Sequence, residues 1–215
     1  MIPAFASRFL RCRSLASVMV IVFLALALQA CQANAQQKQM NMTNGQLKEI
    51  YLAGGCFWGT EHYFKQIDGV VDTEVGYANG TTVNPTYKEV CTDKTGFAET
   101  VHVTYNPAKV SLKFLLEMYF KAIDPTSVNR QGNDIGTQYR TGVYYTDPAD
   151  KPTIDAVFAE EQRHISGLIE VEKLPLHNFY RAEDYHQDYL DKNPSGYCHL
   201  PKSLFDLARQ AKEKR

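Results

Sequence analysis

A helix with one apolar face that directly follows an alternating strand is the feature that most restricts how this chain can fold. Apolar residues between positions 112 and 123 recur every three or four residues, as on a helix that buries one side. Positions 98–105 alternate instead with a period of two, as on a half-buried strand, and Asn106-Pro107 separates the two patterns. A sheet with helices packed against it is therefore predicted.

Both periodicities recur along the chain. Strands are predicted at residues 49–53, 71–77, 98–105 and 139–145, with a further short one at 168–171. One helix is predicted to begin at Cys56 or Phe57, and others to cover residues 112–123, 153–165, 184–190 and 203–212. Some connections are long enough for crossovers and others are not. The order therefore predicts an α+β fold, a two-layer α/β sandwich with a mixed sheet flanked by helices, related to the ferredoxin-like arrangement.

Residues 1–35 have the layout of a secretory signal peptide. Three arginines come first, positions 15–28 are almost wholly apolar and carry no charge, and small residues follow. The apolar stretch is short for a membrane span, although a single uncleaved anchoring helix is the alternative. We therefore expect export to the bacterial cell envelope and a periplasmic location.

Two cleavage sites are compatible with this segment. Ala33-Asn34-Ala35 fits a small-x-small site, which would leave Gln36 as the first residue. Leu28-Gln29-Ala30-Cys31 resembles a bacterial lipoprotein box, in which Cys31 would carry lipid. In either case the polar residues up to position 47 offer little to bury. Residues 36–47 are therefore predicted to be a flexible tether, and residues 48–215 to be one folded domain.

The charge balance and the cysteines limit the function classes. With Lys+Arg 23 against Asp+Glu 24, nothing favours nucleic acid as a partner. Cys56, Cys91 and Cys198 fall in the predicted domain, and an odd number in an exported chain indicates a reactive thiol rather than a fixed set of disulfides. The sequence has no CxxC pair and no Cys/His cluster at metal spacing, so no metal site is predicted.

Cys56 is the main candidate for a reactive thiol. It stands in Gly55-Cys56-Phe57-Trp58-Gly59, where the predicted helix begins. A helix N-terminus stabilises a thiolate through its dipole and its unpaired N–H groups, so we expect a lowered pKa. Phe57 and Trp58 would add exposed aromatic surface beside the sulfur, suited to a methyl group. A small buried cysteine at a strand–helix junction explains the position equally well.

Glu99 is the candidate proton donor. It is in phase with Val101, Val103 and Tyr105, which directs its carboxyl toward the core side of the sheet. Burial there would raise its pKa and keep it protonated near neutrality. A protonated carboxyl can deliver a proton to an oxygen atom that must leave as water. The alternative, a strand-end carboxylate that reaches solvent, is the one favoured by general burial preferences.

Several ordered motifs resemble those of the A-type peptide methionine sulfoxide reductases. Residues 55–59 are similar to the GCFWG active-site motif of that family, and residues 76–87 resemble its GYxGG and NPxY segments. Ala98-Glu99 falls where the family has GHAE. Residues 131–140 resemble its QGNDxGTQYR segment, and residues 182–198 its C-terminal pattern. The resemblance spans about residues 48–200 and makes residues 48–215 the expected catalytic reductase domain.

The resemblance implies a reaction. Methionine S-sulfoxide, free or in oxidised proteins, would be reduced to methionine, which repairs the protein. Cys56 would attack the sulfoxide sulfur while Glu99 protonates its oxygen, and Cys56 would become a sulfenic acid. Cys198 would then attack Cys56 to form a disulfide, and an external dithiol such as thioredoxin or a thioredoxin-like protein would reduce it. We expect no bound cofactor, and we expect the protein to be a monomer.

The resemblance also implies supporting roles. Tyr87 and Tyr139 would donate hydrogen bonds to the sulfoxide oxygen, and Asp134 would orient the site. Phe57 and Trp58 would form the pocket for the methyl group on the sulfur.

The sequence departs from the usual family pattern at a few positions. Phe97 stands where members usually carry His, and it would dry the surroundings of Glu99. No cysteine follows Cys198, so a two-cysteine cycle is expected, and Cys91 is interpreted as structural. Nothing in the sequence brings His186 near Cys56, so a surface or structural role is expected.

Two other function classes stay open at this point. A cysteine-dependent peroxidase or acyl hydrolase could use the same thiol. A tethered binding module with an inert thiol would need no chemistry, and a Cys56 pKa near the free value would favour it.

Overall fold

The structure, a computed structural model, describes residues 46–213 of the 215-residue chain. The predicted signal peptide with Cys31 and nearly all of the predicted tether lie outside the described residues. The strands of the main sheet are β1 (Lys48–Gly54), β2 (Val70–Ala78), β3 (Ala98–Tyr105), β6 (Thr141–Tyr145), β7 (Glu172–Pro175) and β8 (Phe179–Arg181). A second, two-stranded sheet consists of β4 (Arg130–Gln131) and β5 (Asp134–Ile135).

The helices are α2 (Phe57–Lys65), α3 (Tyr87–Val90), α4 (Leu112–Ala122), α5 (Lys151–Gln162), α6 (Tyr189–Lys192) and α7 (Lys202–Gln210), with the 3-10 turns η1 (Thr137–Tyr139) and η2 (Pro148–Asp150). Within the described part of the chain, no helix has the length and hydropathy needed to cross a bilayer.

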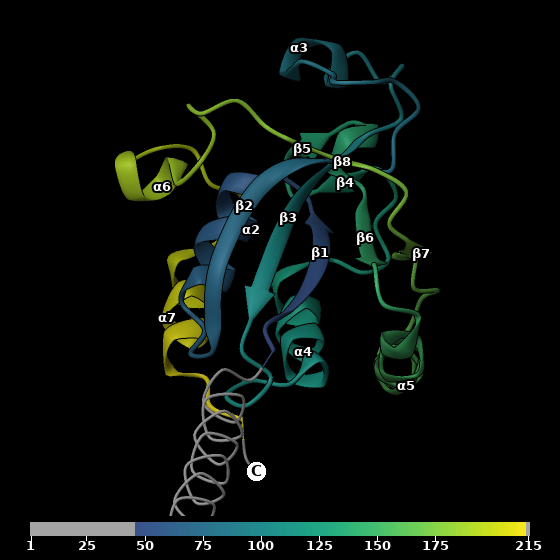
Figure 1. The fold of residues 1–215 in the computed structure, drawn as a ribbon, viewed down its shortest axis with the longest axis vertical. Coiled ribbons are helices and arrows are strands. Elements are labelled where there is room, and N and C mark those ends of the chain that lie inside the picture. The colour runs from purple at the N-terminus through teal and green to yellow at the C-terminus, as the bar shows by residue number, and fades with distance from the viewer. Residues whose placement is uncertain (1–45, 214–215) are drawn as a thin grey trace, which may run out of the picture. The chain divides into compact units, whose positions relative to one another are not determined.

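The main sheet has the strand order β7-β6-β1-β3-β2-β8 (Figure 1). Every neighbouring pair is antiparallel except β6 and β7, which are parallel. The four central strands, with α2 between β1 and β2 and α4 between β3 and β6, follow the βαββαβ order of ferredoxin-like sheets. The predicted α+β fold with a mixed sheet flanked by helices is confirmed.

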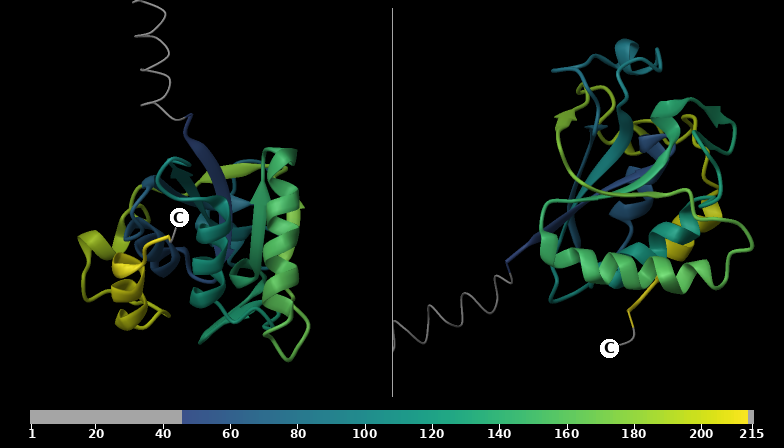
Figure 2. Two further views of the ribbon diagram at one scale, coloured as in Figure 1. Left: turned by 90° about the horizontal axis from the view of Figure 1, so that it is seen from below. Right: turned by 90° about the vertical axis from the view of Figure 1, so that its right-hand side faces the viewer.

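The alternation along β3 separates the two faces of this sheet. Val101 and Val103 belong to the main core, which the helices cover, and α4 packs beside α5 there (Figure 2). Ala98 belongs to a smaller cluster with Tyr51 and Tyr144 on the opposite face. Glu99 has the same parity as Val101, so its carboxyl points to the helix side, between the sheet and the N-terminus of α2.

Local signals set the helix boundaries. The Ser111 hydroxyl accepts a hydrogen bond from the N–H of Phe114 over 3.1 Å and so caps α4, which ends before Asp124-Pro125. Thr86 and Glu89 form a reciprocal capping box that begins α3.

Three predicted elements are wrong in extent. The strand expected at 168–171 lies instead at 172–175, where no residue is buried, so no alternation of apolar and polar residues marks it. The helix expected at 184–190 is reduced to α6, because Asp188 adopts a left-handed φ of 54° and interrupts it. Tyr139 lies in η1 rather than in strand β6.

Candidate active site

Cys56 occupies the junction between β1 and α2. It is the residue that caps α2, and the preceding Gly55 has a φ of 81°, which favours glycine. A Cβ atom at Gly55 would also lie 2.6 Å from the side chain of Gln131. The chain therefore turns sharply at Gly55 and leaves the Cys56 side chain only 6% exposed.

The expected lowering of the Cys56 pKa is wrong for the free protein. The backbone N–H groups of Trp58 and Gly59 do favour the thiolate, as a helix N-terminus should. Burial and the nearby Glu99 carboxyl oppose them, and the pKa of the thiol rises well above its usual value. Sequence alone could place the helix end but not the amount of protein packed around it.

Glu99 lies directly behind this helix end. The side chain is buried, and its Oε2 accepts a hydrogen bond from the N–H of Phe57 over 3.1 Å. Its Oε1 is buried and has no hydrogen-bond partner within residues 46–213. Burial raises the pKa of Glu99 to about 8, only partly offset by the Phe57 N–H. At neutral pH this carboxyl is therefore mostly protonated and able to donate a proton.

Two tyrosine hydroxyls approach the same region. Tyr87 begins α3, where its N–H donates to the Glu183 carboxylate over 2.9 Å, and Tyr139 ends η1. The two hydroxyls interact with each other, and burial together with the Glu99 carboxyl raises the pKa of both. Both phenols therefore stay protonated and can donate hydrogen bonds.

The two aromatic residues after Cys56 differ in exposure. Phe57, expected to be exposed, is 1% exposed and packs against Tyr77 and His186. Trp58 is half-buried and stacks on Tyr189, with the ring centroids 3.7 Å apart. Its indole N–H donates to His186 Nδ1 over 3.0 Å. Trp58 is thus held in one orientation by a stacked ring and a hydrogen bond.

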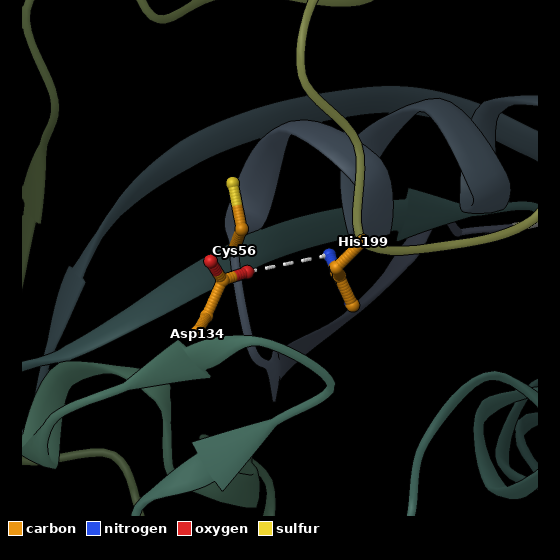
Figure 3. Close-up of side chains that lie close together, drawn as sticks. All are labelled: Cys56, Asp134 and His199. Carbon is orange, nitrogen blue, oxygen red and sulfur yellow. Dashed lines mark ion pairs between the residues drawn. The ribbon is translucent and has the colours of Figure 1, made fainter.

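Asp134 reaches the site from β5. Its Oδ1 accepts a hydrogen bond from the Tyr197 hydroxyl over 2.7 Å, and its Oδ2 lies 4.0 Å from His199 Nδ1. Figure 3 shows the Asp134 carboxylate below the Cys56 side chain and facing the His199 ring, with the ion pair between Asp134 and His199 dashed. The structure therefore brings Asp134 next to Cys56, together with two residues of the C-terminal segment.

Cys198 approaches the first turn of α2 from this same segment. A Cβ atom at Gly59 would lie 2.9 Å from the Cys198 Sγ, so the glycine makes room for the sulfur. Cys198 is half-buried and accepts a hydrogen bond from the N–H of Leu200 over 3.4 Å. It also borders a cavity of about 750 Å³ between α6 and α7. Cys56, Cys91 and Cys198 are all free thiols.

Several residues at the site were missed or misassigned from the sequence. His186 is 1% exposed and contacts Phe57, Trp58 and Tyr87, so it lies within the site. The interpretation of Cys91 as structural stays a prediction; its side chain is exposed, and its thiol interacts with the Tyr87 hydroxyl. Tyr197 and His199 were also missed, although they flank Cys198 directly in the sequence. His186 lies within residues 182–198, the segment that resembles the C-terminal pattern of the family, and that was the available signal for it.

Phe97 lies near the site, and it belongs to the same core as Val101, on the face of the sheet to which Glu99 points. Its ring is buried against Tyr180, with centroids 5.7 Å apart, and a Cβ atom at Gly80 would lie 2.2 Å from it. Phe97 therefore fills the space between the loop after β2 and strand β8, and it adds to the apolar surroundings of the site.

Known proteins resemble this chain in both sequence and fold. A family model described as peptide methionine sulfoxide reductase matches residues 48–215. The peptide methionine sulfoxide reductase MsrA of Clostridium acetobutylicum is 56% identical over 158 residues, which cover 74% of this chain and 98% of that protein. The corresponding protein of Lachnoclostridium phytofermentans is 55% identical over 164 residues, covering 76% and 99%.

Solved structures agree with these relatives. The reduced form of Mxr1 from Saccharomyces cerevisiae is 44% identical, with a TM-score of 0.68, and covers 71% of this chain and 88% of its own. Methionine sulfoxide reductase A of Corynebacterium diphtheriae is 41% identical, with a TM-score of 0.65, and covers 71% and 77%. The chain therefore belongs to the peptide methionine sulfoxide reductase family.

Proposed function

We propose that this protein reduces methionine sulfoxide, free or within oxidised proteins, to methionine, with Cys56 as the attacking residue. One observation carries the assignment of roles. A buried carboxyl with a pKa of about 8, that of Glu99, is hydrogen-bonded to the first residue of the helix that begins beside Cys56. A protonated acid and a thiol thus lie together in surroundings that exclude water, as the reduction of an S–O bond requires.

The first half of the reaction balances without an external proton. Glu99 protonates the sulfoxide oxygen while the Cys56 sulfur bonds to the sulfoxide sulfur. The thiol proton of Cys56 passes to Glu99. The hydroxyl then moves from the methionine sulfur to the Cys56 sulfur, and the newly formed S–S bond breaks with its electron pair going to the methionine sulfur. Methionine is released, and Cys56 becomes a sulfenic acid. Tyr87 and Tyr139 stabilise the charge that develops on the oxygen through hydrogen bonds, and the helix N-terminus stabilises the developing thiolate.

The second half regenerates the thiol. The Cys198 thiol attacks Cys56, a disulfide forms, and the hydroxyl leaves as water after taking up the Cys198 proton. The contact of Cys198 with Gly59, in the first turn of α2, supports this pairing. An external dithiol such as thioredoxin or a thioredoxin-like protein then reduces the disulfide by exchange. The half-buried Cys198, beside a cavity, is the sulfur that such a partner reaches more readily than the buried Cys56.

The substrate methyl group fits against Phe57 and Trp58, with Asp134 orienting the site through Tyr197. Recognition of the S epimer is the finer part of this proposal. The test is an assay of the two separated epimers of methionine sulfoxide with dithiothreitol as reductant. Turnover of the S epimer alone is expected. Turnover of the R epimer alone would contradict the epimer assignment, and turnover of hydrogen peroxide but of neither epimer would favour a peroxidase.

The cellular location and the oligomeric state of the enzyme are proposed from its sequence. Export to the bacterial envelope rests on the predicted signal at residues 1–35, and a monomer able to meet many oxidised proteins is expected. Mass spectrometry of the mature N-terminus distinguishes the two processing routes. A chain beginning at Gln36 supports ordinary cleavage, whereas a lipid-modified Cys31 supports anchoring of the enzyme to a membrane.

A further inference from the structure

Three side chains that can each supply a metal ligand meet beside the N-terminus of α2. The Cys56 Sγ, a carboxylate oxygen of Asp134 and a ring nitrogen of His199 all lie within 4.8 Å of one another (Figure 3). They come from the start of α2, from β5 and from the segment between α6 and α7, so only the folded chain brings them together. We propose that this cluster binds one divalent cation, preferentially Zn²⁺, which reversibly blocks Cys56.

The His199 ring is prepared to act as a ligand. Its Nε2 lies 3.1 Å from the carbonyl oxygen of Gly54, which can only accept a hydrogen bond, so Nε2 carries the hydrogen. In the neutral ring the lone pair is then on Nδ1. The side chain is 3% exposed, and Nδ1 has no hydrogen-bond partner in the described part of the chain.

Asp134 presents a second unpaired acceptor to the same point. The Tyr197 hydroxyl holds Oδ1, which leaves Oδ2 buried, without a hydrogen-bond partner among residues 46–213, and 4.0 Å from His199 Nδ1. That distance is too long for a hydrogen bond, and a carboxylate facing a nitrogen lone pair is unfavourable. A cation between the two atoms would satisfy both, which is the arrangement of an imidazole–carboxylate metal site.

The charge and the chemistry of the three ligands suit Zn²⁺. A Cys56 thiolate and the Asp134 carboxylate together balance the charge of a divalent ion. Sulfur, imidazole nitrogen and carboxylate oxygen form a ligand set that Zn²⁺ accepts in tetrahedral geometry. Tetrahedral zinc places its ligand atoms about 3.3–3.6 Å apart, so the cluster must contract by about an ångström. The fourth position is left for water.

Binding would stop the reductase reaction by a simple exchange. The ion replaces the thiol proton of Cys56, which is released to solvent, and no electron is transferred. The sulfur lone pair that would attack the sulfoxide is then shared with the metal. A chelator removes the ion and restores the thiol, so the block is reversible, and it also shields Cys56 from oxidation.

The test uses Co²⁺ as a spectroscopic probe for Zn²⁺, with the full chain reduced, free of oxygen and without an affinity tag. One ion per chain is expected, with a sulfur-to-cobalt charge-transfer band that is lost in Cys56→Ser. His199→Gln and His199→Asn are expected to weaken binding by at least about tenfold and to relieve inhibition by Zn²⁺ in parallel. His164→Ala, an exposed histidine on α5, is the matched control and should bind as wild type does. Circular dichroism verifies that each variant is folded.

Two results would overturn the proposal. One is a charge-transfer band that survives Cys56→Ser and disappears in Cys198→Ser, because the ion would then be bound by the other thiol. The other is equal affinity in folded wild-type, His199 and His164 variants. Because cobalt binding is measured without substrate, a metal-free enzyme that fails to reduce sulfoxide would count against the proposed function alone.

Discussion

The Glu99 carboxyl accepts a hydrogen bond from the backbone N–H of Phe57 over 3.1 Å, at the helix end that also holds Cys56. A buried carboxyl is thereby fixed beside a buried thiol, with a pKa of about 8 that keeps it protonated at neutral pH. Position and protonation state together make Glu99 the acid of the proposed reaction.

Replacing Glu99 by glutamine should slow methionine sulfoxide reduction by about 10²–10⁴-fold, the usual contribution of a general acid. In the wild type the rate should fall as pH rises through about 8, because Glu99 then loses its proton. The variant should lack this decrease. Single-turnover release of methionine between pH 6 and 10 measures both effects, and a variant within a factor of about ten of wild type would exclude Glu99 as the acid.

The same carboxyl should make stability depend on pH. Folding raises the Glu99 pKa from 4.5 to about 8, so between these values the folded state holds a proton that the unfolded state has lost. Stability therefore decreases as pH rises across this range, and Glu99→Gln removes that decrease. The free energy of unfolding in urea, variant minus wild type, should increase by a few kcal/mol between pH 5 and pH 8. The exposed Glu170→Gln should show no such trend.

A side chain at position 59 should impair only the second half-reaction, in which the disulfide forms. A methyl group there would lie 2.9 Å from the Cys198 Sγ and 3.2 Å from His199 Nδ1. Gly59→Ala should favour the helix by about 1 kcal/mol yet displace the Cys198 segment. Disulfide formation should slow by about tenfold or more. It is measured as the loss of free thiols after one turnover. The unchanged first release of methionine is the internal control, and unchanged disulfide formation would contradict this contact.

His186 should act on substrate binding through the single tryptophan. Its Nδ1 accepts the hydrogen bond of the Trp58 indole, so His186→Phe leaves that N–H unpaired and frees the ring to move. KM for methionine sulfoxide should rise by about tenfold, with a smaller change in kcat. The near-ultraviolet circular dichroism of Trp58 should weaken as well. A fall in kcat with KM unchanged would instead place His186 in the chemical step.

Local patterns predicted the parts of the site that lie within one element. The phase of Glu99 on its strand and the place of Cys56 at a helix start are set by residues close in sequence, and both were predictable. The approach of His186 and His199 to Cys56 depends on tertiary packing, which no spacing in the sequence reveals. The Cys56 pKa was predicted in the wrong direction for the same reason, because burial outweighs the helix end. Strand β7 was predicted at the wrong residues because none of its residues is buried, so its sequence has no alternation of apolar and polar positions.

A Cys198→Ser variant separates the role of Cys56, the attacking residue, from that of Cys198, its disulfide partner. Incubated with methionine sulfoxide and no added reductant, it should release one methionine per chain and then stop. Mass spectrometry should find the single added oxygen on Cys56. Two results would contradict these roles. One is continued turnover of the variant when thioredoxin, free of dithiothreitol, is the only reductant. The other is oxygen found on Cys91 while Cys56 is unmodified.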